Sequence, residues 1–170
     1  MYRVVNSIKR KICLFLVNKI FAGKECFDIK RNLLNQIREF EIGKGTKIVG
    51  PIECTGQLKI GQDCWIGKNL KINGNGKVTI GDCCDIAPEV TFQTGGHLIG
   101  TSIRRAGKGK IFNQTIGNGV WIGGRSTIIG NTTIGDGCVI AGCACVVNDL
   151  EENILVGGVP ARVIRKLDEN

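Results

Sequence analysis

The sequence predicts an all-β protein, a parallel β-helix of hexapeptide repeats, with an N-terminal α-helical extension and an extruded loop. The main observation is a six-residue period, because apolar side chains return at Ile116, Ile122, Ile128, Ile134, Ile140 and Val146. This period fits neither an α-helix nor ordinary strand and turn spacing, and it is typical of a β-helix. The composition agrees: 25 glycines in 170 residues and only 5% aromatic residues suit tight turns and small inward side chains.

Residues 1–40 form the predicted helical segment. Apolar residues recur at helical spacing between residues 3 and 21, with Val4 among them and basic residues in between, and a second helical pattern runs from Ile29 to Phe40. The segment carries nine Lys or Arg against three Asp or Glu, a net charge of +6 out of +8. The helices either cap the body or pack on a partner subunit, or the first helix lies on an anionic membrane surface. Charge alone does not separate these interpretations.

Residues 41–150 form the predicted β-helix domain, in which three hexapeptides make one coil of 18 residues. The register starts at Ile42 and passes an insertion between Ile72 and Ile80, which predicts a bulged corner. It then lapses after Phe92, so residues 98–109 are predicted to form an extruded loop, and such loops are usually functional. Residues 151–170 are predicted to be a C-terminal tail that covers the open end of the β-helix.

Composition and charge disfavour several classes of protein. The chain outside residues 1–40 is close to neutral and lacks aromatic residues interleaved with basic ones, so no nucleic-acid binding is expected. The nine cysteines have no metal-ligand spacing, and several, such as Cys64, Cys84 and Cys138, are expected to be buried free thiols in a reducing cytosol. The longest apolar run is too short to span a membrane and no signal-peptide cleavage pattern follows it. A cytoplasmic location is therefore expected.

Two features of the repeat could carry chemistry. His97 is the only histidine and stands where the extruded loop begins, so it is either a general base or an ordinary surface residue. A lone histidine argues against a metal hydrolase or a β-helix carbonic anhydrase, and no metal site is expected. Gly124 and Gly142 are 18 residues apart and should stack, which gives either a groove for an extended arm such as pantetheine or ordinary turn glycines.

Residues 42–167 resemble the hexapeptide-repeat acyltransferases, and among them the maltose/galactoside acetyltransferase-like O-acetyltransferases. One matching block is Val-Thr-Ile-Gly-Asp at 78–82, followed by Ile-Ala-Pro at 86–88 and by Gly96-His97. The other two are Ile-Gly-Asn-Gly-Val-Trp-Ile-Gly at 116–123 and Gly-Gly-Val-Pro-Ala-Arg-Val-Ile at 157–164. Bare hexapeptides identify only a fold, whereas these three blocks together indicate the family.

The resemblance implies a left-handed β-helix homotrimer that uses acetyl-CoA as its acetyl donor, with active sites between neighbouring subunits. His97 matches the family's general base, and the backbone N–H of Gly124 matches the donor that faces the acetyl carbonyl. Trp121 matches the residue that walls the acetyl end, with a packing role as the alternative. The positions matching contacts with coenzyme A are Gly124, Gly142, Arg162 and Arg165.

The acceptor is where the chain departs from the family's pattern. The acceptor-positioning asparagine of sugar-specific members falls at Gly67 here, so either Asn69 or Asn75 substitutes for it or the acceptor differs. The loop sequence that contains Arg104 and Arg105 resembles that of family members described as serine acetyltransferase-like. The sequence therefore predicts O-acetylation of a sugar or glycan precursor hydroxyl, as in polysaccharide biosynthesis. The alternatives are serine O-acetylation, N-acetylation of an amino sugar or antibiotic, and a non-catalytic β-helix scaffold.

Overall fold

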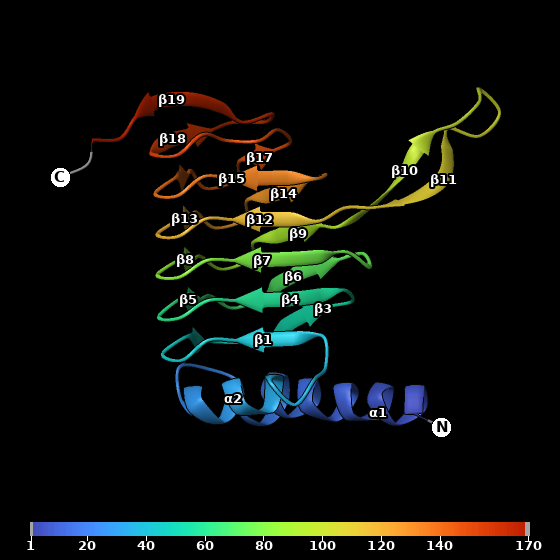
Figure 1. Cartoon of the computed structure of the whole chain (residues 1–170), viewed down its shortest axis with the longest axis vertical. Coiled ribbons are helices and arrows are strands. Elements are labelled where there is room, and N and C mark those ends of the chain that lie inside the picture. Colours follow the sequence, from blue (N-terminus) through green and yellow to red (C-terminus); the bar gives the residue numbers. More distant parts are fainter. Residues whose placement is uncertain (1, 169–170) are drawn as a thin grey trace.

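The chain folds into a stack of flat coils, with helices across one end and a hairpin that projects from one side (Figure 1). The structure is a computed structural model that describes residues 2–168, with side chains from Val5 onward. The side chain of Val4, predicted to lie on the apolar side of the first helix, is outside the described residues. The predicted fold class, a parallel β-helix with an N-terminal helical extension, is confirmed.

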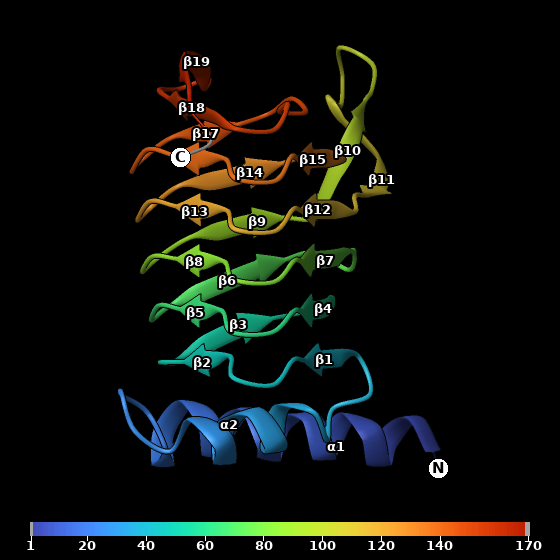
Figure 2. The same cartoon turned by 60° about the vertical axis from the view of Figure 1, so that its left-hand side comes forward.

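Each coil contributes one short strand to each of three sheets, which are parallel except for the last strand of the chain, as Figures 1 and 2 show. Sheet A contains β1 (Phe40–Ile42), β4 (Gln57–Ile60), β7 (Lys77–Ile80), β12 (Gln114–Ile116) and β15 (Thr132–Ile134). Sheet B contains β2 (Lys47–Ile48), β5 (Trp65–Ile66), β8 (Asp85–Ile86), β13 (Trp121–Ile122), β16 (Val139–Ile140), β18 (Ile154–Gly157) and β19 (Arg162–Lys166). Sheet C contains β3 (Ile52–Cys54), β6 (Leu70–Asn73), β9 (Thr91–Gln93), β14 (Thr127–Ile129) and β17 (Cys145–Val146).

The six-residue period builds the core directly. Ile42 pairs with Ile60, which pairs with Ile80, and the column continues through Ile116 and Ile134. All five are buried, and each isoleucine removed from water stabilises the fold by about 1.5–3 kcal/mol. The insertion of two residues before β7 does not break the column, because the extra residues stay in the corner between β6 and β7.

The N-terminal helices cap one end of the stack, which is one of the arrangements expected for this segment. They are α1 (Tyr2–Phe15), its π-helical continuation η1 (Leu16–Ile20) and α2 (Phe27–Leu34). Cys13, Val17 and Leu34 are buried in the same cluster as the isoleucine columns. The prediction that the second helix reaches Phe40 is wrong, because Phe40 pairs with Leu58 as the first residue of β1.

Two asparagine side chains bind the free backbone edges of the first strands in sheets A and C, as a neighbouring strand would. The side chain of Asn18 donates to the carbonyl of Ile52 and accepts from its N–H, both at 2.9 Å. Asn35 does the same for Ile42, at 2.9 and 2.7 Å. A primary amide carries N–H donors and a carbonyl acceptor side by side, so each asparagine pairs with both backbone groups of a strand edge that would otherwise be unpaired.

Lys30 contacts the backbone just after β2, the edge strand of sheet B. Its Nζ donates to the carbonyls of Gly23 at 2.6 Å and Val49 at 3.3 Å, and it lies 4.7 Å from the centre of the Phe27 ring. The residue is fully buried, and burial lowers the pKa of its ammonium. The helical layer thus supplies polar partners to the edge strands of sheets A and C and to the residue that follows β2.

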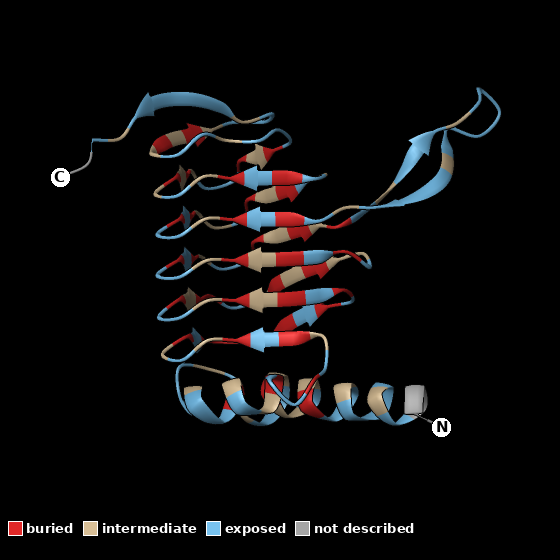
Figure 3. Cartoon of the chain, viewed as in Figure 1, coloured by how far each residue is buried: buried red, intermediate tan, exposed pale blue. Residues whose placement is uncertain are grey.

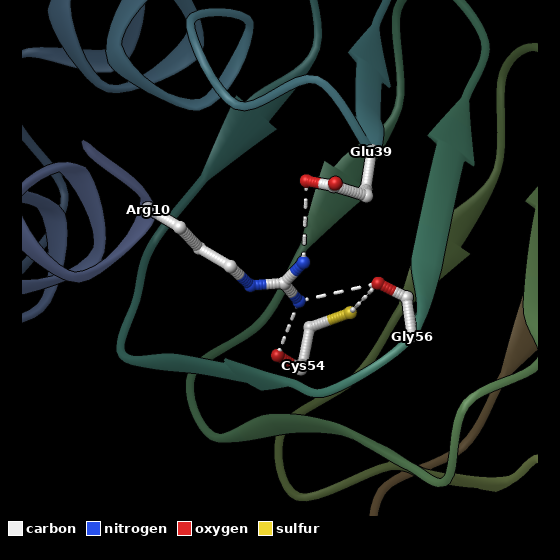
Figure 4. Close-up of polar contacts among 4 residues, drawn as sticks. All are labelled: Arg10, Glu39, Cys54 and Gly56. Carbon is white, nitrogen blue, oxygen red and sulfur yellow. Dashed lines mark hydrogen bonds and ion pairs between the residues drawn. The ribbon is translucent and has the colours of Figure 1, made fainter. Parts of the chain in front are cut away.

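Arg10 ties α1 to the first coil (Figure 4). Its Nη2 donates to the carbonyls of Cys54 at 2.6 Å and Gly56 at 3.2 Å, and its Nη1 lies 3.5 Å from the Glu39 carboxylate. The guanidinium also stands 5.1 Å from the centre of the Phe40 ring. These contacts fix which side of α1 faces the β-helix, and therefore which side faces outward.

The prediction of an extruded, structureless loop is only partly right. The segment is a β-hairpin of β10 (Gly95–Ile99) and β11 (Ala106–Ile111), so it starts three residues earlier than predicted and is paired. The hairpin lacks the hexapeptide register, because its two strands pair with each other and not with a coil. At the C-terminal end, β18 extends sheet B and buries Ile154 and Val156, while β19 lies antiparallel along it.

Cys64, Cys84 and Cys138 are buried free thiols, as predicted. None of the helices in the described part of the chain has both the length and the hydrophobicity to cross a membrane.

Candidate active site

His97 lies in the middle of β10, and the opposite strand holds its ring. The residue faces Gly109 across the hairpin and is exposed. Its Nδ1 is 2.8 Å from the carbonyl oxygen of Gly107. Because a carbonyl oxygen only accepts, Nδ1 carries the hydrogen of the neutral ring and Nε2 keeps its lone pair. Nε2 can therefore take a proton from a molecule beside the hairpin.

An open hollow of about 600 Å³ lies beside His97 at the root of the hairpin. The inserted corner and both hairpin strands line it, and its larger side chains are Asn73, Asn75, Gln93, His97, Lys110 and Ile111. Of the two asparagines predicted to position an acceptor, Asn75 lines the same hollow as His97 and Asn69 does not. Amide and ammonium groups of this kind suit a ligand rich in hydroxyls.

Close packing fixes the root of the hairpin. A Cβ on Gly74 or Gly76 in the inserted corner would collide with the backbone of Gly95 or Phe112, so the corner fits under the hairpin only with glycine at these two positions. Below it the buried Gln114 donates from Nε2 to the carbonyls of residues 93, 128 and 130 at 3.2, 3.0 and 3.1 Å. The hollow is therefore held on rigid elements, although its wall is a projecting hairpin.

Gly124 and Gly142 stack at the corner where sheet B passes to sheet C, as the 18-residue spacing predicts. A Cβ on Gly142 would lie 3.3 Å from the carbonyl oxygen of Gly124, and one on Gly124 would lie 3.2 Å from that of Pro88. The amides of residues 123 and 125 donate to neighbouring coils, whereas no acceptor within the described chain meets the N–H of Gly124 or Gly142. The corner thus offers a strip without side chains and with two free donors.

Beside this strip lies an ion pair between neighbouring coils that the sequence analysis did not predict. Arg125 Nε lies 2.8 Å from the Glu89 carboxylate of the coil below, and both residues line a polar hollow of about 470 Å³ that also contains Asn69. Asn69, Glu89 and Arg125 all have left-handed backbones, with φ of 60°, 65° and 61°. Glu89 and Arg125 are 36 residues apart, which is the length of two regular coils. They nevertheless lie in adjacent coils, because the hairpin takes up the additional residues.

The remaining predicted contacts with coenzyme A lie on sheet B. Trp121 is 56% exposed on its outer face, beside Asp85 and Val139 of the neighbouring coils, so it is not a core residue. Arg162 and Arg165 are exposed on β19. Arg162 stands at the end of β19 nearest the corner that carries Gly142, because its neighbour Ala161 donates to the carbonyl of residue 145.

The candidate residues fall into two groups at different corners of one chain. His97 and Asn75 lie where sheet C passes to sheet A, and Gly124 and Gly142 lie where sheet B passes to sheet C. Arg104 and Arg105 are at the exposed tip of the hairpin and line neither hollow. A single chain therefore does not bring the predicted base to the predicted groove.

Gly67 is the family position at which this chain lacks an asparagine, and its surroundings leave no room for one. The residue is buried, and a Cβ there would lie 2.6 Å from the backbone nitrogen of Pro88. Any acceptor contact must therefore come from other positions.

Known proteins share both the repeat and the whole outline of the chain. Residues 115–148 match the bacterial transferase hexapeptide family of six repeats. Galactoside O-acetyltransferase of Escherichia coli is 40% identical over 112 residues, which are 66% of this chain and 55% of that protein. A hexapeptide-repeat acetyltransferase from Vibrio cholerae superposes with a TM-score of 0.84 and 26% identity, over 98% of this chain and 93% of that one. The chain contains the bacterial transferase hexapeptide repeat and resembles the hexapeptide-repeat acetyltransferases in sequence and fold.

A second structure adds a ligand to the comparison. A galactoside acetyltransferase solved in complex with coenzyme A superposes on this chain with a TM-score of 0.79 and 26% identity, over 96% of this chain and 81% of that one. The likeness thus extends beyond the repeat to the helical end and the hairpin. The chain nevertheless spans only about half of the length of the curated relative that it matches.

Residues 2–168 contain no group of three or more His, Cys, Asp or Glu side chains that could hold a metal ion. The groups that the two corners offer are instead a free imidazole nitrogen, backbone N–H donors, amides and guanidinium groups. These are the groups that acyl transfer to a hydroxyl needs.

Proposed function

We propose that the protein is an acetyl-CoA-dependent O-acetyltransferase that transfers acetyl to a hydroxyl of a sugar or glycan precursor. The observation that carries this proposal is the ring of His97, whose Nδ1 is bound by the Gly107 carbonyl so that Nε2 faces outward as a base. The acetyltransferase relatives and the coenzyme A complex of a similar protein support the choice of donor.

In the proposed mechanism, Nε2 of His97 takes the proton of the acceptor hydroxyl as its oxygen attacks the thioester carbonyl. The carbonyl oxygen then carries negative charge, and the free N–H of Gly124 donates to it. When the tetrahedral intermediate collapses, the carbon–sulfur bond breaks and the imidazolium returns its proton to the coenzyme A thiolate. No further co-reactant is needed.

The groove at the corner of sheets B and C suits the extended arm of the donor. The pantetheine amides would lie along the strip of Gly124 and Gly142, where side chains are absent and backbone donors are free. The exposed ring of Trp121 would wall the acetyl end, and the guanidinium groups of Arg162 and Arg165 would meet the phosphates.

We infer that the working unit is a homotrimer. Because one chain keeps His97 and Gly124 at different corners, the hairpin of one subunit must approach the groove of the next to complete the site. Three copies close such a head-to-tail arrangement around a threefold axis. We place the enzyme in the cytoplasm, where the donor acetyl-CoA is made, and in polysaccharide biosynthesis.

The acceptor is the least determined part of the proposal. Asn75 lines the hollow of His97 and is our first candidate for holding a sugar hydroxyl, ahead of Asn69 at the other corner. Serine, or the amino group of an amino sugar or antibiotic, is the alternative acceptor, and Arg104 and Arg105 at the hairpin tip would then meet a carboxylate or phosphate. A non-catalytic scaffold is the alternative of another class.

The decisive experiment replaces His97 by Asn and measures acetyl transfer across a panel of sugars, nucleotide sugars, amino sugars and serine. Mass spectrometry of the acetylated product is the readout, because the exposed thiols of Cys26, Cys83 and Cys143 would react with thiol reagents. We expect a loss of about 100- to 10,000-fold in His97→Asn. The matched control is Ile103→Ala, which changes a 96% exposed residue of the same hairpin. Equal turnover of His97→Asn and the control refutes the mechanism, and no acetyl-CoA binding by calorimetry indicates a scaffold.

A further inference from the structure

The outer side of α1 carries an apolar surface that the β-helix does not cover. Four of its side chains recur at helical spacing and are more than half exposed: Val5 at 55%, Ile8 at 53%, Ile12 at 54% and Phe15 at 58%. Val5, Ile8 and Ile12 also line one apolar hollow. We call the four residues Val5, Ile8, Ile12 and Phe15 the outer stripe.

The stripe lies opposite the contacts that hold α1 in place. Cys13 and Val17 are buried against the first coil, and Arg10 reaches the carbonyls of β3. The helix therefore has two apolar sides, and only one of them packs against the β-helix. A stripe of large aliphatic and aromatic side chains that faces away from the core marks a binding surface.

The orientation of the helix suits a flat partner. Figures 1 and 2 show α1 and α2 lying across the end of the stack, nearly at right angles to the direction in which the coils are stacked. Figure 3 colours much of this helical layer as exposed. A helix that binds at the surface of a bilayer lies in this way, parallel to the plane, with its apolar side pressed into the headgroup region.

The charge beside the stripe indicates what the partner must be. From residue 2 to residue 20 the chain has five Lys or Arg and no Asp or Glu. Lys11 and Lys19 are exposed and, among the described residues, form no ion pair or side-chain hydrogen bond, while Lys9 contacts only the amide of Gln36. A second copy of the same helix would bring like charges together, whereas anionic headgroups would neutralise them.

We propose that the outer stripe, with Lys11 and Lys19 beside it, docks the protein peripherally on an anionic membrane surface. The apolar side chains enter the boundary between headgroups and acyl chains, and the lysines meet the negative headgroups. This inference does not depend on the proposed acetyl transfer.

The test is flotation of the full chain with vesicles of phosphatidylcholine alone and with vesicles containing 30% phosphatidylglycerol. We expect binding to the anionic vesicles, weaker binding at 0.5 M salt, and little binding to neutral ones. Lys11→Gln with Lys19→Gln should weaken binding about 25-fold, because each cation near the surface contributes about fivefold. Ile8→Ser with Ile12→Ser should abolish it, and since both residues are exposed these variants keep the folded core.

Matched controls change the same kinds of residue far from the helical end. Ile99→Ser with Ile103→Ser replaces two exposed isoleucines of the hairpin, and Lys108→Gln with Lys166→Gln removes two exposed lysines. Both controls should float like the unchanged protein. Failure of the unchanged protein to float with anionic vesicles, or equal flotation of the Ile8→Ser and Ile12→Ser variant, overturns the proposal. A concentration-dependent rise in native mass that this variant removes would also overturn it and assign the stripe to a second copy.

Discussion

Replacing Asn18 by Ala should weaken the whole β-helix, although the residue lies in the helical layer and outside the repeat. The change removes the donor and the acceptor that pair with the backbone of Ile52, both at 2.9 Å. Each lost hydrogen bond costs about 1 kcal/mol net, and a backbone group left unpaired costs about 1–3 kcal/mol. Because Ile52 is 1% exposed and water reaches it poorly, we expect a loss of about 2–4 kcal/mol in the free energy of unfolding.

The assay is urea unfolding followed by circular dichroism at one fixed protein concentration, since assembly would couple stability to concentration. Asn32→Ala is the matched control, because Asn32 is an exposed asparagine of α2 with no side-chain partner in the described chain, and it should cost less than about 0.5 kcal/mol. Asn18→Asp keeps the acceptor but turns an oxygen toward the Ile52 carbonyl, so it should be nearly as harmful as Ala. An Asn18→Ala variant no less stable than Asn32→Ala would refute the view that these amides replace a missing strand.

Two further predictions concern the groove and a buried thiol. Gly142→Val fills the strip above Gly124, where a Cβ would already lie 3.3 Å from the carbonyl oxygen of Gly124. The KM for acetyl-CoA should therefore rise at least about tenfold, or 1.4 kcal/mol. The control Cys143→Ser, at the next position, should change this KM little. Burial raises the pKa of the Cys54 thiol from 9.0 to about 11, so between these pH values the unfolded chain ionises and the folded chain does not. Stability should therefore fall by about 3 kcal/mol as the pH rises through this window, and the fall should be smaller by that amount in Cys54→Ala, as unfolding curves at pH 8 and pH 11 would show.

The sequence predicted the body of the protein well because its structure is encoded locally. A leading aliphatic every six residues decides which side chain of each short strand faces inward, and stacking then follows without information from distant parts of the chain. The same counting correctly placed Gly124 under Gly142. Counting in sixes did not predict the pairing of residues 95–111, which form a hairpin. The helical spacing that included Phe40 was misleading, because Phe40 pairs with Leu58 in a sheet.

The repeat period and the motif blocks predicted the coil, its core column and the family that the chain resembles. Tertiary structure alone decided how the coil ends, because the partners of Ile52 and Ile42 are side chains 34 and 7 residues away that no period relates to them. It also decided that Asn75 shares a hollow with His97, and that His97 and Gly124 stand at different corners. These relations depend on the direction in which the hairpin leaves the stack and on the packing at its root. The six-residue repeat encodes neither of them.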